Sequence, residues 1–190
     1  MPLTSLERAA KLKQEADELL DTIKLAELCR GIGPMTPTGS YYLDVMVYPD
    51  IDVYLPPARP RQLFEVVSHL TEHHPVVRVN FLNQGMGPLK DGRYIKPVID
   101  VGNWGRPWKI DIWAVDQAFI DQKQAELDDL KARMTMELRT FILGYKYSIL
   151  NEEGRTPMYS GIHIYRGVLD HGLRTHGELS DYLRQQGIAV

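Results

Sequence analysis

The sequence predicts an α+β fold in which a β-sheet is flanked by helices and followed by a helical C-terminal part. Two observations support this prediction. Strand-like segments occur between residues 50 and 115, and helical periodicity dominates the segments before and after them. Hydrophobic residues make up 44% of the 190 residues and charged residues 25%, which is enough apolar material for a sizeable core.

The first predicted element is an amphipathic helix from about Ser5 to Arg30. Thr4 and Glu7 have the spacing of a capping box at its start, and Gly31 follows its end. Apolar residues recur at steps of three and four, which places them on one face of the helix. These residues are Leu12, Ala16, Leu19, Ile23 and Ala26.

The next segments predict the sheet. Residues 41–48 are rich in aromatic and β-branched residues, which is typical of a strand, and they follow a loop at 35–40. Residues 50–55 alternate polar and apolar side chains as a half-buried strand does. A helix is predicted from about Leu63 to His74, and a turn at 85–88. Further strands are expected at 76–82, 94–101 and 108–115, the last two as an antiparallel hairpin.

The C-terminal segment is predicted to be helical. The pattern runs from residue 117 to 150, with a break expected at Gly144, and two short helices follow at 162–173 and 178–186. We therefore expect residues 1–116 to form the sheet core with the N-terminal helix. Residues 117–190 would form a helical extension packed on that core, and residues 117–150 are a candidate homodimer face.

Composition excludes several classes of protein. The net charge is only -3, with 22 basic and 25 acidic residues, so nucleic acid is not favoured as a partner and a small molecule is preferred. Cys29 is the single cysteine, which excludes an internal disulfide, and its apolar surroundings predict a packed thiol. The charged N-terminus is no signal peptide and no apolar run reaches about 20 residues, so we expect a cytoplasmic protein without membrane contact.

Three aspartates are the strongest candidates for a chemical site. Residues two apart on a strand project from the same face, so Asp50 and Asp52 point the same way while their neighbours enter the core. Asp111 stands between two isoleucines on a later strand and is expected to project in the same manner. Like charges this close are unfavourable unless a cation or water lies between them. Converging carboxylates suit Mg²⁺, and two such ions can clamp an in-line phosphoryl displacement.

A glycine and a serine precede these carboxylates. Gly39 allows the backbone to approach a phosphate closely, and the amide and hydroxyl of Ser40 are suited to donate to phosphate oxygens. If Ser40 opens a helical turn, the helix N-terminus adds favourable charge. Phosphate donors followed by a pair of carboxylates indicate a triphosphate site.

Gly39-Ser40, nine intervening residues and Asp50-Ile51-Asp52-Val53 resemble the signature of the DNA polymerase β-like nucleotidyltransferase superfamily. Asp111 resembles its third carboxylate. Small antibiotic nucleotidyltransferases and related minimal nucleotidyltransferases are similar in size and layout. The resemblance spans roughly residues 38 to 115. It implies a nucleotidyltransferase-like mixed sheet.

The resemblance also implies a role for each residue. Gly39 and Ser40 would contact the β- and γ-phosphates of a nucleoside triphosphate (NTP), and Asp50 and Asp52 would bridge metal ions to it. Asp111 would bind the catalytic metal and orient or deprotonate the acceptor hydroxyl. A nucleoside monophosphate would pass to this hydroxyl with release of pyrophosphate, with Mg²⁺ as cofactor and two ions expected.

One departure from the family pattern leaves other functions open. Family members often carry Arg or Lys after the Gly-Ser pair, whereas residues 41–49 contain no cation and Asp44 adds a negative charge. Lys109, on the same strand face as Asp111, is our candidate for the missing positive charge. The alternatives are a catalytically weak protein of this fold that acts as a binding or antitoxin partner, and a metal-dependent phosphodiesterase.

Each candidate residue also has a structural interpretation. Asp50 and Asp52 are also compatible with the solvated face of an edge strand, Gly39-Ser40 with an ordinary turn, and Asp100 competes with Asp111 for the third position. For the remaining candidates we favour structural roles over zinc binding or base stacking. These are His69 and His73 at a solvated helix end, and Trp104, Trp108 and Trp113 in core and rim packing.

Overall fold

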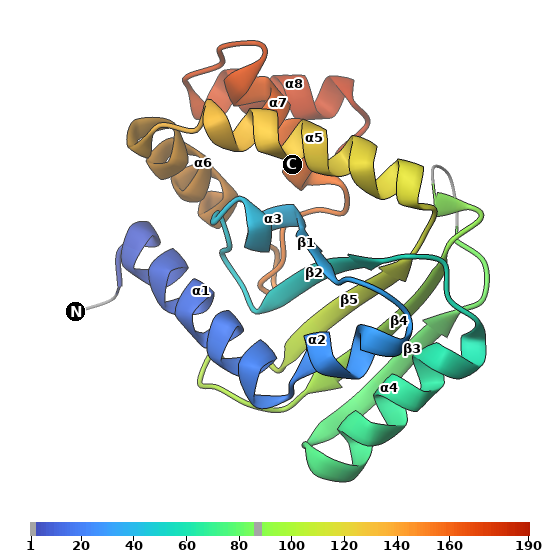
Figure 1. Ribbon diagram of the computed structural model, residues 1–190. Coiled ribbons are helices and arrows are strands. Elements are labelled where there is room, and N and C mark those ends of the chain that lie inside the picture. Colours follow the sequence, from blue (N-terminus) through green and yellow to red (C-terminus); the bar gives the residue numbers. More distant parts are fainter. Residues whose placement is uncertain (1–2, 86–88) are drawn as a thin grey trace.

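The computed structural model describes residues 3–85 and 89–190 of the chain. Within these residues, five strands form one mixed sheet in the order β1-β2-β5-β4-β3 (Figure 1). β2 and β5 pair in parallel, and the other neighbouring strands pair antiparallel. The strands are β1 (Thr36–Thr38), β2 (Asp50–Leu55), β3 (Val76–Leu82), β4 (Arg93–Ile99) and β5 (Trp108–Ala114).

Helices from the first half of the chain cover one face of this sheet (Figure 1). They are α1 (Ser5–Thr22), α2 (Leu25–Leu28) and α4 (Pro60–His73). Ile51 and Val53 of β2 face these helices and share a core cluster with Leu12 of α1 and Leu63 of α4. Because side chains alternate along a strand, the residues between them face the opposite side of the sheet.

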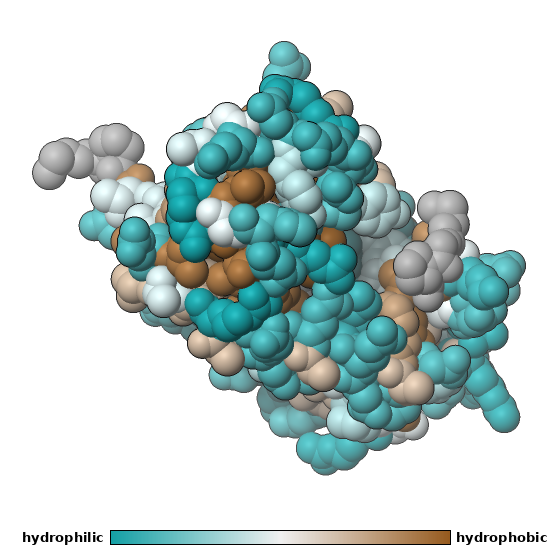
Figure 2. Space-filling model, turned by 90° about the horizontal axis from the view of Figure 1, so that it is seen from above, coloured by the Kyte–Doolittle hydropathy of each residue, from teal (hydrophilic) through white to brown (hydrophobic). Residues whose placement is uncertain are grey.

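The remaining helices lie on that opposite side (Figure 1). They are α3 (Gly39–Tyr42), α5 (Gln117–Ala132), α6 (Met136–Ser148), α7 (Ser160–Leu169) and α8 (His176–Gln185). A second core cluster joins α5 to α8 with Leu43, Val45 and Val47, which precede β2. Seen from above, the surface is mostly hydrophilic, with hydrophobic residues visible between the hydrophilic ones (Figure 2).

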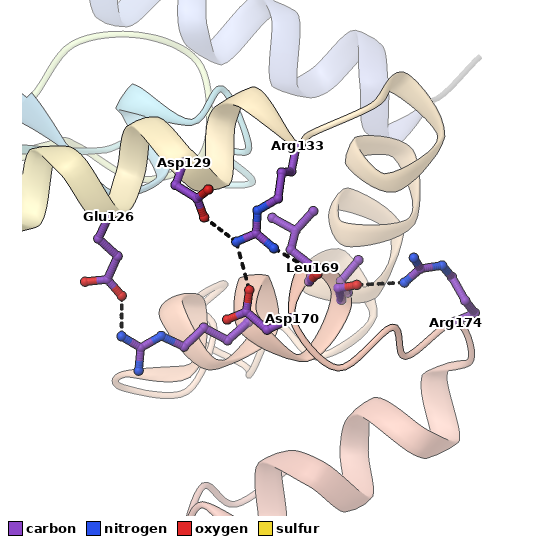
Figure 3. Close-up of polar contacts among 8 residues, drawn as sticks. Glu126, Asp129, Arg133, Leu169, Asp170 and Arg174 are labelled. Atoms are coloured by element: carbon purple, nitrogen blue, oxygen red, sulfur yellow. Dashed lines mark hydrogen bonds and ion pairs between the residues drawn. The ribbon is translucent and has the colours of Figure 1, made fainter.

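Ion pairs on the surface connect α5 to α7 (Figure 3). Glu126 of α5 pairs with Arg166 of α7. Arg133, at the end of α5, pairs with Asp129 at 2.5 Å and with Asp170 at 2.8 Å, and it donates a hydrogen bond to the carbonyl of Leu169. These contacts hold the end of α7 against α5, on the outside of the second core.

The predicted N-terminal helix is broken earlier than expected. The Thr4–Glu7 capping box starts α1 as predicted. α1 ends at Thr22, however, and Lys24 adopts the left-handed conformation with φ 51° before α2 and a 3-10 turn at Cys29–Gly31. Ile23 and Leu25 on both sides of the break are buried. The apolar periodicity therefore continues across a change of direction, which is why it does not reveal the break.

Two other segments differ from their predictions. Residues 41–48, expected to be a strand, contain α3 and an irregular stretch with Asp44 in the left-handed region, and β1 forms inside the expected loop at 35–40. The apolar side chains of this stretch fill the second core instead of extending the sheet. The break expected at Gly144 lies between α5 and α6, where Thr135 caps α6 by accepting a hydrogen bond from Leu138 N.

The strand predictions hold more closely. β2 and β3 have the predicted bounds, and β4 and β5 form the expected antiparallel pair. The turn expected at 85–88 lies mostly outside the described residues. Within the described parts of the chain, no helix combines the length and the apolar character needed to cross a bilayer.

Candidate active site

Strands β2 and β5 place the three predicted aspartates on one face of the sheet. The strands run parallel, and their register sets Asp52 beside Asp111 and Asp50 beside Lys109. The isoleucines that alternate with these residues have no exposed surface. A shift of one residue would move them out of the core, so their burial fixes the direction of the carboxylates.

The predicted glycine lies against these carboxylates. Gly39 has φ +61°, and a Cβ added there would collide with Asp52 Oδ2. Thr38 of β1 pairs with Asp52 across the strands and brings the backbone of Gly39 to this point. Ser40 follows in the first turn of α3, which is the helical turn that the sequence suggested. Only glycine fits at this first position of α3, because the conformation is left-handed and Asp52 fills the space where a Cβ would lie.

Two lysines face the carboxylates from the same side of the sheet. Lys109 Nζ lies 3.7 Å from Asp50 Oδ1, and Lys96 Nζ of β4 lies 3.8 Å from Asp111 Oδ1. Lys109 is 6% exposed. Both separations exceed hydrogen-bond distance, and within the described residues neither carboxylate oxygen has a hydrogen-bond partner. Lys109 lies on the strand face of Asp111, as expected, and its role toward a nucleotide stays a prediction. Lys96 was not among the residues singled out in the sequence.

A third lysine approaches from the helical side. Lys146 of α6 is 3% exposed, and its Nζ donates hydrogen bonds to the carbonyl of Val45 at 2.6 Å and to the hydroxyl of Tyr165 at 3.1 Å. Burial lowers the pKa of Lys146 to about 7, although the charges of Asp52 and Asp50 act in the opposite direction. The sequence analysis missed this lysine. Its signal was a cation four residues after Ile142 on the buried stripe of a helix.

The three carboxylates lie close together in a position where the sheet and the neighbouring helices partly bury them. Burial raises the pKa of Asp50, and the neighbouring charge of Asp111 raises it further. Burial and the charges of Asp50 and Asp111 raise the pKa of Asp52 well above its ordinary value. Both effects disfavour the ionised carboxylates, which is the condition that a bound cation relieves.

The arrangement is compatible with a divalent cation. Among residues 3–85 and 89–190, no three acidic, histidine or cysteine side chains stand ready together to hold a metal ion, and two of the aspartates face lysines. The donor set nevertheless fits Mg²⁺, which prefers carboxylate oxygens. Asp50 and Asp111 each present a buried oxygen without a hydrogen-bond partner in this part of the chain, and Asp52 adds a third carboxylate on the same face.

The other candidate residues lie elsewhere. Asp100 follows the end of β4, is exposed and is not part of this cluster. His69 and His73 pack ring to ring on α4, which covers the other face of the sheet. Trp108 is buried, Trp104 lies beneath the guanidinium of Arg8 and Trp113 packs against Tyr94. Cys29 is buried, as predicted, and burial raises the pKa of its thiol to about 12.

Comparisons with known proteins find similarity in structure. No protein-family model and no curated protein matches the chain. A cytoplasmic RNA terminal U-transferase matches with a TM-score of 0.56 and 16% identity, over 85% of this chain and 49% of the other. Cid1 poly(U) polymerase bound to MgATP matches with a TM-score of 0.52 and 16% identity, over 75% and 45%. The non-canonical poly(A) polymerase complex GLD-2–GLD-3 gives 0.51 and 12%, over 82% and 53%.

The chain spans about half the length of these matched chains. At such low identities the likeness concerns the arrangement of helices and strands. This arrangement agrees with the motif of Gly39-Ser40 and the paired aspartates. The chain has the mixed-sheet fold of the nucleotidyltransferases, as the resemblance to the DNA polymerase β-like superfamily implied.

Proposed function

We propose that this chain is a metal-dependent nucleotidyltransferase that moves a nucleoside monophosphate from an NTP to a hydroxyl acceptor and releases pyrophosphate. The observation that carries the proposal is the placement of Asp50, Asp52 and Asp111 on one face of two paired strands, against a left-handed glycine. The fold shared with a U-transferase and with poly(U) and poly(A) polymerases supports the same class of reaction.

In this proposal the chain binds the triphosphate from two sides. The backbone amides at Gly39-Ser40 and the hydroxyl of Ser40 donate to the β- and γ-phosphates. Lys146, held between the carbonyl of Val45 and the hydroxyl of Tyr165, supplies positive charge that residues 41–49 lack. A buried ammonium that is poorly compensated in the free protein gains a partner when an anion arrives.

The aspartates would hold Mg²⁺ and direct the acceptor. Mg²⁺ bound by Asp50, Asp52 and Asp111, two ions in our proposal, would neutralise the triphosphate and the attacking oxygen. Asp111 orients the acceptor hydroxyl and accepts its proton. The acceptor oxygen bonds to the α-phosphorus as the bond to the bridging oxygen of the β-phosphate breaks, and pyrophosphate leaves.

The test is release of pyrophosphate from ATP, GTP, CTP or UTP in the presence of Mg²⁺ and candidate acceptors. We expect Asp52→Asn to lower the rate by more than about a hundredfold. Its unfolding midpoint should not fall, because the change removes one of several crowded, buried charges. Asp100→Asn, outside the site, is the matched control and should keep full activity. Normal turnover by Asp52→Asn would refute the assignment.

The absence of a cation from residues 41–49 favours one competing function, that of a catalytically weak protein of this fold that acts as a binding or antitoxin partner. Calorimetry with the four NTPs separates the two functions. Absence of Mg²⁺-dependent binding of all four NTPs would support the binding or antitoxin partner. Hydrolysis of a phosphodiester without release of pyrophosphate would instead indicate the phosphodiesterase.

Three further expectations enter the proposal. We propose that the protein is cytoplasmic, that it binds no membrane and that residues 117–150 form a homodimer face. The acceptor is open, because the preference for a small molecule rested on the net charge of the whole chain. The matched proteins are named as RNA U-transferase and as poly(U) and poly(A) polymerases, so they give that preference no support.

A further inference from the structure

Three cations gather near the point where β2 and β5 begin. Lys109 is on β5, Arg106 is in the loop that precedes β5, and Arg155 is in the loop between α6 and α7. Arg106 and Lys109 are close in the sequence, whereas Arg155 is distant from both and is brought to them by the fold. Asp50 lies beside it as the first residue of β2.

The aromatic ring of Tyr48 packs against two of these cations, Arg106 and Lys109. Its ring centroid lies 5.1 Å from the guanidinium of Arg106 and 5.6 Å from Lys109 Nζ. Its hydroxyl meets Thr156 Oγ1 at 3.2 Å. Arg106 in turn donates hydrogen bonds to the backbone carbonyls of residues 153 and 154, at 3.1 Å and 2.5 Å. The two loops are thus joined and hold the cations in fixed positions.

The positive charge of this cluster is only partly compensated. Lys109 is ion-paired with Asp50. Because Asp50 is also proposed to bind Mg²⁺, it would compensate the charge of Lys109 less once the metal ion is bound. Arg155 has one carboxylate nearby, Glu153 at 3.8 Å, whose side chain is 72% exposed. The Nε of Arg155 is buried, and in the described parts of the chain it has no hydrogen-bond partner.

The pKa of Arg106 also indicates that the positive charge of the cluster is only partly compensated. Burial lowers the pKa of Arg106, and the charge of Arg155 lowers it further, against the opposing charges of Asp50 and Glu153. Arg106 and Lys109 both lie near the ring of Tyr48, so these two like charges are also close to each other. The three cations therefore repel one another in the free protein. Such a cluster is stabilised by an anion, and guanidinium groups match the oxygens of a phosphate in geometry as well as in charge.

The position of the cluster separates it from the proposed triphosphate site. Gly39 and α3 lie against Asp52, and the charge of Asp52 acts on Lys146 more strongly than that of Asp50 does. Arg106, Lys109 and Tyr48 lie instead beside Asp50, two residues earlier on β2. A phosphate at the cluster is therefore a different one from the β- and γ-phosphates of the NTP, and Lys109 would serve this phosphate in place of the triphosphate role that the sequence suggested for it.

We propose that the cluster of Arg106, Lys109 and Arg155 binds a phosphate group carried by the acceptor, close to the hydroxyl that is modified. The inference rests on the proposed function and narrows it, because it assigns the acceptor to the class of phosphorylated alcohols. The net charge of -3 does not indicate this class, since it averages over the whole surface. The phosphate is a monoester of a small molecule or the diester next to the end of an oligonucleotide.

The test compares acceptors that differ only in phosphate. Adenosine, adenosine 5′-monophosphate and the dinucleotide ApA all offer ribose hydroxyls, with no phosphate, a monoester and a diester. Their binding is measured by calorimetry with Mg²⁺ and a non-hydrolysable ATP analogue present, and pyrophosphate release from ATP is measured in parallel. We expect at least one phosphorylated probe to bind about tenfold or more tightly than adenosine. The preferred probe identifies the source of the phosphate.

Variants assign this preference to the cluster. Arg155→Gln should weaken the preferred probe about tenfold and leave the affinities for adenosine and for the ATP analogue unchanged. Arg61→Gln is the matched control, because Arg61 is an exposed arginine on α4 whose ion-pair partner is Glu65. Equal binding of all three probes, or equal weakening by both variants, would overturn the inference. If the natural protein prefers a phosphorylated probe but releases no pyrophosphate with any acceptor, the proposed function is refuted and the phosphate site is retained.

Discussion

Lys146 occupies a position that is unfavourable for a lysine in the free protein and favourable once an anion binds. Its ammonium is buried, hydrogen-bonded to one carbonyl and one hydroxyl, and its pKa is lowered to about 7. The nearby Asp50 and Asp52 have raised pKa values for the corresponding reason. The free site thus holds buried charges of both signs at a cost in stability, as preorganised binding sites commonly do.

The lowered pKa of Lys146 predicts how nucleotide affinity depends on pH. Between pH 7.5 and 9 the free lysine is mostly unprotonated, whereas a bound triphosphate favours the protonated form. Binding therefore takes up a proton, and affinity falls as the pH rises, by up to about tenfold per pH unit. Calorimetry with Mg²⁺ and a non-hydrolysable NTP measures this slope.

A variant provides the control for this prediction. In Lys146→Arg the guanidinium keeps its proton throughout the range, so the slope should become nearly flat. A pH-independent affinity of the natural protein between pH 7.5 and 9 would contradict the role assigned to Lys146.

At the residue scale, the sequence predicts the carboxylates better than the cations. Asp50, Asp52 and Asp111 each interrupt an apolar strand pattern, so alternation alone sets their direction. Lys146, Lys96 and Arg106 approach the same group of aspartates from a helix, another strand and a loop. Long side chains in such positions ordinarily face solvent, so only the packing of distant segments reveals that they converge.

At the scale of elements, the junction of α1 and α2 contains a local strain. Lys24 is exposed and adopts φ 51° and ψ 40°, which a side chain with a Cβ rarely does. The turn is maintained because it buries Ile23 and Leu25 on either side. The conformation thus costs free energy that the packing of its neighbours offsets.

Replacing Lys24 by glycine should therefore stabilise the protein. We expect Lys24→Gly to raise the free energy of unfolding by about 0.5 to 1 kcal/mol, after allowance for the greater freedom of glycine in the unfolded chain. Denaturant unfolding followed by circular dichroism measures the change. In Lys11→Gly, an exposed site within α1, the same replacement should destabilise by about 1 kcal/mol. Equal losses in both variants would contradict the strain at Lys24.

The sequence predicts an element well when its apolar pattern stops at the same residue as the helix or strand itself. β2 and β3 end at prolines or polar loops, and their predicted bounds are correct. The helices around Lys24 and Arg133 are broken where the apolar pattern continues. Residues 41–48 have strand-like composition but pack against α5 to α8, because tertiary burial outweighs intrinsic propensity.

At the scale of the whole molecule, two cores lie on opposite sides of one sheet. The second core unites Leu43, Val45 and Val47, from the first part of the chain, with residues of α5 to α8. Ala9 of α1 also belongs to it. The predicted division into residues 1–116 and 117–190 therefore passes through a shared core.

Removal of the C-terminal helices should prevent independent folding. A fragment of residues 1–116 would expose Leu43, Val45 and Val47, which are at most 2% exposed in the full chain. We expect no cooperative thermal transition and strong binding of a hydrophobic dye, with the full chain as the control. A cooperative transition at the midpoint of the full chain would show that residues 1–116 fold on their own.

The parallel register of β2 and β5 links the stability of the fold to the placement of the proposed metal ligands. If the register of β5 shifted by one residue, Ile110 and Ile112 would face the aspartate side of the sheet and Asp111 would enter the hydrophobic core. The shifted molecule would therefore lose both core packing and a proposed metal ligand. A folded but catalytically dead register isomer should therefore not accumulate. Selection for a stable sheet alone is enough to keep the acidic groups in alignment.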